Sequence, residues 1–254
     1  MITKISIFKK IFEKGVTFDK KTGTYDFDFD KDRKNDIMNL QPMYKRSKML
    51  ERDGVKYHYY FAYEYKHGTH DGFLKAIKYI DNGITNQQAQ ELTANAVTNL
   101  LEQHDIRNQN FSAIIYPQSS SKILTRFVNE LMEQALIDNV IDNAFVKNSV
   151  KNIELDLPAV KKLPPQTQKQ VYSVFNKIKN MKTEFKLKDV YTRYRKFIKN
   201  FIKLDKGISR KVTGKKIILM DDYHTTGATL KEMTNILIEH QPTEIFIIVL
   251  IKVK

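Results

Sequence analysis

The sequence predicts an α/β protein with an open, mainly parallel sheet flanked by helices and with an N-terminal α+β extension. In two units, residues 111–136 and 215–237, a short apolar run is followed by a polar loop and then by apolar residues at helical spacing. A β-rich run, Glu244–Val253, follows the second unit. Because helices join the strands in such units, parallel pairing of the strands is expected.

Length and composition are consistent with one large α/β domain that carries additions. A chain of 254 residues can bury a proper core. We expect an N-terminal extension of uncertain structure over residues 1–50, a main domain over 51–254, and a basic helical insertion at about 150–215. The chain has no cysteine, which excludes disulfides and cysteine-ligated zinc. No apolar run resembles a secretory signal or a membrane span, so a soluble, cytoplasmic protein is expected.

The formal net charge is +14, and much of it lies in residues 181–216, which contain thirteen lysines and arginines and only three acids. Such a surface attracts nucleic acid through phosphate contacts. It equally attracts a small anionic substrate. A lysine-rich composition also arises in AT-rich genomes without any function, so charge alone does not separate these readings.

The first fifth of the chain is weakly patterned. Residues 25–32 alternate acids with phenylalanines, which predicts a strand or hairpin arm with an acidic outer face. A calcium loop is excluded because Lys31 occupies the required glycine position and Ile37 the position of the final glutamate.

Residues 55–66 form the clearest alternating segment and predict a strand. The aromatic side chains expected on one face are those of Tyr57, Tyr59, Phe61, Tyr63 and Tyr65. An aromatic strand face is usually core, although aromatics beside lysines could also stack bases. Three histidines nearby, His58, His67 and His70, lack the acid or thiol spacing of a metal site.

Further elements are expected from periodicity and from helix and turn signals. Helices are predicted over residues 71–80, 86–104 (with Thr85 as N-cap), 123–136, 165–182 and 189–204. Strands are predicted over residues 111–116 and 140–146.

The run of residues 215–230, KKIILMDDYHTTGATL, is the most informative part of the chain. Residues 217–220 predict a short buried strand, and Asp221 and Asp222 follow where that strand leaves the sheet. The loop 225–229 then offers hydroxyls and close-packed backbone amides at the start of a helix, which is a natural anion site. Carboxylates beside that site would repel a bare phosphate unless they bind hydroxyls attached to it, so a sugar phosphate is the ligand indicated. The alternative is an ordinary strand–turn–helix with solvated acids.

This run resembles the binding motif for 5-phosphoribosyl-1-pyrophosphate in type I phosphoribosyltransferases: four apolar residues, two acids, two variable residues, then Thr-Thr-Gly-Ala/Gly-Thr/Ser. The resemblance implies that Asp221 and Asp222 hold the two ribose hydroxyls. It also implies a wrap around the 5-phosphate by Thr225, Thr226, Gly227, Ala228 and Thr229.

The same resemblance suggests two further binding segments. The loop after the first core strand binds pyrophosphate in this family, and its place here is taken by Gln118, Ser119, Ser120, Ser121 and Lys122. A mobile basic loop closes over the family's active site, and residues 206–211 are the candidate because Gly207 permits bending.

The order of elements over about residues 55–254 most resembles the ComF-like branch, although the cysteine zinc module common in that branch cannot exist here. Thr225 stands where hypoxanthine-guanine phosphoribosyltransferases place an aspartate general base, which makes a 6-oxopurine acceptor less expected. His224 is open to two readings, a proton carrier or a contact to a neighbouring strand or loop.

The resemblance therefore implies an enzyme that binds 5-phosphoribosyl-1-pyrophosphate with Mg²⁺ and transfers phosphoribose to a nitrogenous acceptor. Asp221 and Asp222 would reach the metal indirectly, through ribose or water. One alternative is a non-catalytic member that binds a protein partner, or nucleic acid through the basic 181–216 region. A structural component of a viral assembly is another, and a homo-oligomer is compatible with each reading.

Overall fold

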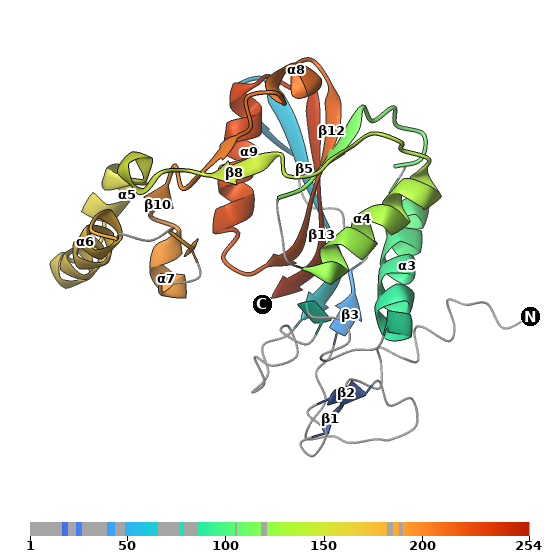
Figure 1. The fold of residues 1–254 in the computed structure, drawn as a ribbon, viewed down its shortest axis with the longest axis horizontal. Helices are drawn as coiled ribbons and strands as arrows, with labels where there is room; N and C mark the ends of the chain where they lie inside the picture. Colours follow the sequence, from blue (N-terminus) through green and yellow to red (C-terminus); the bar gives the residue numbers. More distant parts are fainter. Residues whose placement is uncertain are drawn as a thin grey trace, which may run out of the picture.

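The computed structural model describes residues 17–19, 24–26, 40–43, 49–65, 77–78, 86–104, 106–117, 121–181, 185–187 and 190–253 (Figure 1). In this part of the chain a seven-stranded sheet has the order β3-β5-β13-β12-β6-β7, and β4 also pairs with β5. Its strands are β3 (Leu40–Pro42), β4 (Leu50–Arg52), β5 (Val55–Tyr65), β6 (Ala113–Ile115), β7 (Val140–Ile141), β12 (Lys216–His224) and β13 (Glu244–Val253).

The sheet is mainly parallel, as predicted. Neighbouring strands from β5 across to β7 are all parallel, whereas β3 and β4 run antiparallel to β5. The helices α3 (Asn86–Gln103) and α4 (Lys122–Ala135) cover one face, and α9 (Ala228–Glu239) covers the other (Figure 1). The predicted fold class, an α/β protein with a mainly parallel sheet flanked by helices, is confirmed, and the described residues are consistent with an N-terminal extension.

Strand β12 shows how the pattern of side chains produces these layers. Ile218 and Met220 pack against the α3 and α4 side, while Ile217 and Leu219 pack against α9. All four side chains are fully buried, because a strand with helices on both faces has no solvent side. A continuous apolar run is therefore the correct sequence signature for this strand.

Most predicted elements are found, with shifted ends. The predicted strands at 55–66, 111–116 and 244–253 correspond to β5, β6 and β13, and the helices at 86–104 and 123–136 to α3 and α4. The predicted helix 165–182 is α6 (Pro165–Lys179). Of the predicted helix 71–80 only Ile77 and Lys78 are described, and both are helical. Of the predicted N-terminal arm, residues 25 and 26 belong to β2 (Thr24–Asp26), which pairs with β1 (Thr17–Asp19), and residues 27–32 lie outside the described part.

The predicted strand 140–146 is two strands, separated by a turn. β7 belongs to the central sheet, whereas β8 (Phe145–Lys147) leaves it and pairs antiparallel with β11 (Ile202–Leu204). Asn143 in the turn between them adopts a left-handed backbone (φ 54°), which interrupts extended structure.

The aromatic residues of β5 do not share one face. Tyr57, Tyr59 and Phe61 pack on the α9 side, as one face of a strand should. Tyr63 and Tyr65 instead pack on the α3 side, and the Tyr63 hydroxyl donates to the carbonyl of Leu92 in α3 (3.1 Å). The prediction of a single aromatic face is wrong because the alternation breaks after Phe61. The interpretation of the β5 aromatic residues as core, rather than as a base-stacking surface, agrees with their packing in the two core clusters.

Residues 147–201 include a small helical module with its own apolar core, beside the central sheet (Figure 1). Its elements are η1 (Val150–Asn152), β9 (Glu154–Leu155), α5 (Leu157–Lys161), α6, α7 (Thr192–Arg195) and β10 (Ile198–Lys199). The module is joined to the main domain through the β8–β11 pair. An ion pair between Lys199 Nζ and Asp156 Oδ2 (2.8 Å) ties β10 to the start of α5.

The predicted helix over residues 189–204 is wrong. The segment forms the single turn of α7 and then the two short strands β10 and β11, with a left-handed Asn200 (φ 56°) between them. Its aromatic and β-branched residues favour extended structure when partner strands are present, and β9 and β8 supply them. The apolar residues whose helical spacing predicts that helix are nonetheless buried, among them the stripe of Tyr194, Phe197 and Phe201.

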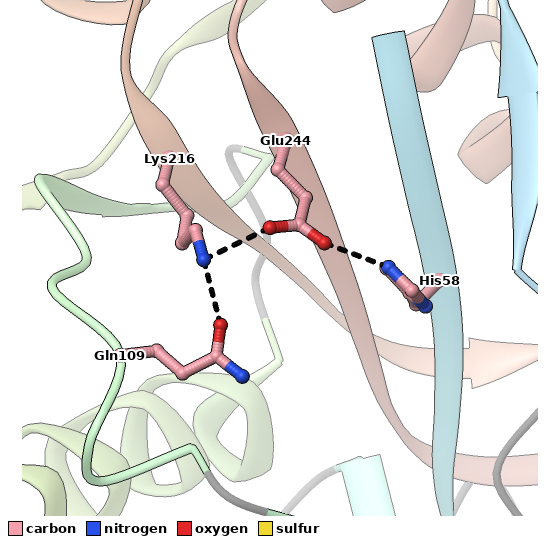
Figure 2. Close-up of polar contacts among 4 residues, drawn as sticks. All are labelled: His58, Gln109, Lys216 and Glu244. Carbon is pink, nitrogen blue, oxygen red and sulfur yellow. Dashed lines mark hydrogen bonds and ion pairs between the residues drawn. The ribbon is translucent and has the colours of Figure 1, made fainter.

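A polar network crosses three strands at the amino end of the sheet (Figure 2). Glu244 on β13 bonds to His58 Nε2 on β5 (2.8 Å) and to Lys216 Nζ on β12 (2.9 Å), and Lys216 also donates to Gln109 (2.7 Å). Burial by itself raises the pKa of Glu244, but hydrogen bonds from Lys216 and His58 outweigh it and leave the pKa lowered. His58 thus serves this network, while His67 and His70 lie outside the described residues.

Candidate functional site

The two polar loops predicted to bind ligand leave the sheet at the same end, where the parallel strands have their carboxyl ends. β6 and β12 are adjacent and parallel, and Ile115, the last residue of β6, pairs with Leu219. The chain after β6 therefore begins level with Met220, one residue before the acidic pair. Ligands of open α/β sheets collect at such carboxyl ends. Of the predicted pyrophosphate loop, Gln118, Ser119 and Ser120 lie outside the described residues, and Ser121 and Lys122 can be placed.

Asp221 and Asp222 are both buried near the end of β12. The backbone amide of Asp222 donates to Asp221 Oδ1 (2.9 Å), which orients the first carboxylate. Asp222 Oδ2 lies 3.6 Å from Lys78 Nζ, beyond hydrogen-bond distance, and is buried without a hydrogen-bond partner among the described residues. A buried carboxylate oxygen in this state is an acceptor available to a ligand hydroxyl.

Burial, and then the neighbouring charge of Asp222, raise the pKa of Asp221 well above its ordinary value. The pKa of Tyr223, which follows the acidic pair, is also raised well above its ordinary value, first by burial and then by the charges of Asp222 and Asp221. The end of β12 therefore holds more negative charge than its surroundings stabilise. A ligand that brings hydroxyl donors or a cation to this point would relieve that excess.

Beyond the acids, the chain forms the small-residue loop and the start of α9. Thr225 and Thr226 are exposed, and Thr226 Oγ1 accepts from the amide of Ala228 (3.4 Å). Gly227 has a left-handed backbone (φ 68°) and immediately precedes the first helical residue, Ala228. The helix is established by the bond from the Lys231 amide to the Gly227 carbonyl (2.8 Å).

The loop thus combines exposed hydroxyls with the positive end of a helix of twelve residues, and Thr229 lies within its first turn. The first amides of a helix have no partner within it and favour an anion. Of the predicted phosphate-wrapping residues, all five lie on this loop and helix start.

His224 folds back over the loop rather than projecting into solvent. Its ring meets those of Tyr59 (centroids 6.2 Å apart) and Phe61 (5.4 Å) edge-on, and its Nε2 is 2.5 Å from the point that a Cβ on Gly227 would occupy. Burial, and then the charge of Lys252, lower the pKa of His224. The ring is therefore neutral near pH 7, and the structure places it in contact with a neighbouring strand, the second of the two predicted readings.

The cations predicted around the site are differently placed. Ser121 is buried at the start of α4, but Lys122 is exposed and lines an open groove on the outer side of α3 and α4 with Asn86 and Arg126. The described residues lining that groove do not include Asp221 or Asp222. Among the described residues, Lys78 approaches the acidic pair; it lies in the run FLKAIKY but has no local signal that identifies it as a site residue.

Residues 206–211 are not a loop over the acidic pair. They lead into the short helix α8 (Ser209–Val212), and Ile208 and Val212 are buried in the core beneath α9. Ser209 Oγ bonds to His240 Nδ1 (2.9 Å) at the opposite end of α9 from Gly227. The prediction that this segment closes over the site is wrong, because its buried apolar residues hold it near the amino ends of the parallel strands, away from the acidic pair.

Among the described residues, no group of three or more His, Cys, Asp or Glu side chains could hold a metal ion by itself. No described helix has the length and apolar character to cross a membrane. Any metal at the acidic pair would therefore need ligand or water oxygens to complete its coordination.

Comparison with protein-family models finds a similarity in the second half of the chain. Residues 158–254 match the family model described as "Phosphoribosyl transferase domain". The matched segment includes β12, the small-residue loop, α9 and β13, and so contains the acidic pair and the candidate phosphate site. A search of curated proteins finds no match to the chain. The similarity of residues 158–254 is thus to a phosphoribosyl transferase domain, and it covers the strand, loop and helix that form the candidate site.

Proposed function

We propose that the protein binds 5-phosphoribosyl-1-pyrophosphate with Mg²⁺ at the carboxyl edge of β12 and transfers its phosphoribosyl group to a nitrogenous acceptor. The observation that carries the proposal is the buried pair Asp221 and Asp222, separated by two residues from a hydroxyl-bearing loop at a helix start, with a carboxylate oxygen that has no hydrogen-bond partner among the described residues. The family similarity of residues 158–254 supports phosphoribosyl transfer in general.

The chemistry divides between these two features. Asp221 and Asp222 would accept hydrogen bonds from the two ribose hydroxyls, because carboxylates are strong acceptors and their burial strengthens such bonds. The amides and hydroxyls of residues 225–229 would hold the 5-phosphate at the positive end of α9. With the ribose fixed at both points, C1 is held in position for attack by a nitrogen nucleophile, and positioning supplies much of the rate.

The donor set fits Mg²⁺, which prefers carboxylate, phosphate and water oxygens and retains several waters. Asp221 and Asp222 would hold it through water or ribose oxygens. When bound, the ion neutralises charge on the pyrophosphate leaving group. The residues of this chain proposed to contact the pyrophosphate are Gln118, Ser119, Ser120, Ser121 and Lys122.

We further propose that the protein works in the cytoplasm and belongs to the ComF-like branch. The structure offers no carboxylate at Thr225 to serve as general base for a 6-oxopurine. We therefore expect an acceptor whose nitrogen is nucleophilic without deprotonation by that position.

The direct test is titration calorimetry with 5-phosphoribosyl-1-pyrophosphate, with and without Mg²⁺. We expect Mg²⁺-dependent binding, weakened about 10- to 140-fold by Asp222→Asn, since a hydrogen bond to a charged group contributes about 1.5–3 kcal/mol. Asp138→Asn, at an exposed carboxylate after α4, is the matched control and should bind as the unmodified protein does. Equal affinity of the Asp222→Asn variant would refute the assignment.

A pyrophosphate-release screen across nitrogenous bases then tests transfer itself. Release with one class of acceptor supports the enzyme, and tight binding without release from any of them supports the non-catalytic alternative.

A further inference from the structure

The helical module carries a concentration of positive charge that the phosphoribosyl site does not use. Residues 147–201, which include the module, contain fourteen lysines and arginines against four acids, Glu154, Asp156, Glu184 and Asp189. Within α6 there is no acidic residue at all. Some of this charge is consumed internally, as by the ion pair of Lys199 with Asp156, but α6 keeps a basic outer side.

Two shallow grooves meet along that side of α6. Both are lined by Lys169 and Ser173, so they adjoin one another. The first continues along the helix to Tyr172 and Lys177, and the second crosses to Tyr191 and Arg193 beside α7. We call these residues, Lys169, Tyr172, Lys177, Tyr191 and Arg193, the basic aromatic face. None of the described residues lining either groove is acidic.

Two tyrosine rings of this face are open to solvent. Tyr191 is 72% exposed and Tyr172 is 36% exposed, which are large values for aromatic residues in a small module with its own core. Val171 and Ile178 of α6 point into the module and are buried, while Val174 and Phe175 are partly buried against the same core. The exposed rings are therefore not part of the core that holds the module together.

The cation beside Tyr191 is held in place. The Arg193 guanidinium lies 4.6 Å from the centre of the Tyr194 ring, and the Tyr194 hydroxyl donates to Gln170 of α6 (2.6 Å). Tyr194 itself is buried, so it serves as a fixed base under Arg193. The face thus has a charged group that is ordered before any ligand arrives.

We propose that the basic aromatic face binds single-stranded nucleic acid. Cations along a groove attract the phosphate backbone, and exposed aromatic rings stack bases, a combination that single strands require. A duplex hides the faces of its bases and would leave both tyrosines unused. A membrane is disfavoured because α6 buries Val171 and Ile178 inside the module and so presents no broad aliphatic face to a bilayer.

The face is separate from the candidate phosphoribosyl site. α6 lies on the far side of the module from the central sheet, whereas Asp221 and Asp222 are at the end of the central strand β12 (Figure 1). Binding at the two places can therefore be tested independently.

The test is fluorescence anisotropy with fluorescein-labelled 20-nucleotide dT and U strands and a 20-base-pair duplex, over a range of salt concentrations. We expect a single strand, DNA or RNA, to bind more tightly than the duplex, and the stronger of the two identifies the ligand. Tyr191→Ala and Tyr172→Ala should each weaken binding about 5- to 140-fold, the range expected for loss of one stacked base. Tyr191→Phe keeps the ring and should bind nearly as the unmodified protein does.

Lys169→Ala should lower the slope of log affinity against log salt by about 0.7, because one phosphate contact to a single strand is lost. Arg107→Ala, at an exposed site between α3 and β6, is the matched control and should leave the slope unchanged. Circular dichroism melting verifies that each variant folds. The proposal is overturned if no strand binds at low salt, if the duplex binds as tightly, or if both folded tyrosine variants bind as well as the unmodified protein.

Discussion

The contact between Gly227 and His224 leads to a quantitative prediction for Gly227→Ala. Gly227 has φ 68°, a conformation that costs a residue with a Cβ about 1–2 kcal/mol. The added Cβ would also lie 2.5 Å from His224 Nε2 and 3.1 Å from Cε1, so the imidazole must move. Moving it sacrifices edge-on contacts with Tyr59 and Phe61, each contributing about 0.5–1.5 kcal/mol. We expect a total loss of about 2–5 kcal/mol in the free energy of unfolding.

The chain supplies a matched control for the backbone part of this loss. Gly214 has nearly the same backbone (φ 65°), but a Cβ there would meet no heavy atom within 4 Å. Gly214→Ala should therefore lose only the conformational part, about 1–2 kcal/mol. Both substitutions reduce the entropy of the unfolded chain equally, so that effect cancels in the comparison.

Urea unfolding followed by far-ultraviolet circular dichroism measures both losses. Repeating Gly227→Ala in a His224→Ala background gives a double-mutant cycle that isolates the steric part. We expect the loss at Gly227 to shrink in that background to the value found at Gly214. The reasoning is refuted if Gly227→Ala costs no more than Gly214→Ala, or if removing the imidazole does not change its cost.

Three further predictions concern buried polar groups. The raised pKa of Asp221 means that its ionised form destabilises the folded state. Asp221→Asn should therefore raise the melting temperature of the metal-free protein at pH 7.5. This gain should vanish as the pH falls toward 3.8, the ordinary pKa of Asp. Glu244 has a lowered pKa, so its ionised form stabilises the fold above pH 4.5, the ordinary pKa of Glu, and this stabilisation is lost as the pH falls through the folded-state pKa. Glu244→Gln should therefore lower the free energy of unfolding by about 1–3 kcal/mol at pH 7 and by less in acid, as measured by urea unfolding. Tyr63→Phe should cost about 1 kcal/mol by the same assay, because the buried hydrogen bond from the Tyr63 hydroxyl to the Leu92 carbonyl is lost; an unchanged midpoint would contradict that bond.

The elements that sequence reasoning predicted best are those whose signal is local. β13 has the predicted bounds, Glu244–Val253, because an unbroken β-rich run buried on both faces has few competing interpretations. The strand, acidic pair, glycine and helix of residues 216–239 also appear in the predicted order. Each step there follows from adjacent residues, including the left-handed turn that Gly227 makes before α9.

The errors arose where distant parts of the chain decide the outcome. The stripe of Tyr194, Phe197 and Phe201 correctly indicated burial, but burial alone does not distinguish a helix from two short strands. The segment forms two strands because β8 and β9, more than forty residues earlier in the chain, pair with them. Asn200 in a left-handed conformation then separates the two strands, and asparagine tolerates that conformation better than most residues.

The candidate site shows the same limit. Asp221 and Asp222 could be selected from their own run, whereas Lys78 approaches them from a segment over 140 residues earlier. The basic residues 206–211 were assigned to the site from their charge and glycine, while Ile208 and Val212 decide their position by burial. Charge indicates what a segment can attract, but apolar anchors determine where it lies.

The pairing of β8 with β11 has a consequence for how this protein could have changed over time. Phe145 and Leu204 are partners in that ribbon, so the chain departs for the helical module and comes back at neighbouring positions. Paired residues in an antiparallel ribbon are only about 5 Å apart, a gap that a tight turn can span. Such an accessory unit can be acquired, exchanged or lost through one tether while the parallel strands and their acidic pair stay in register.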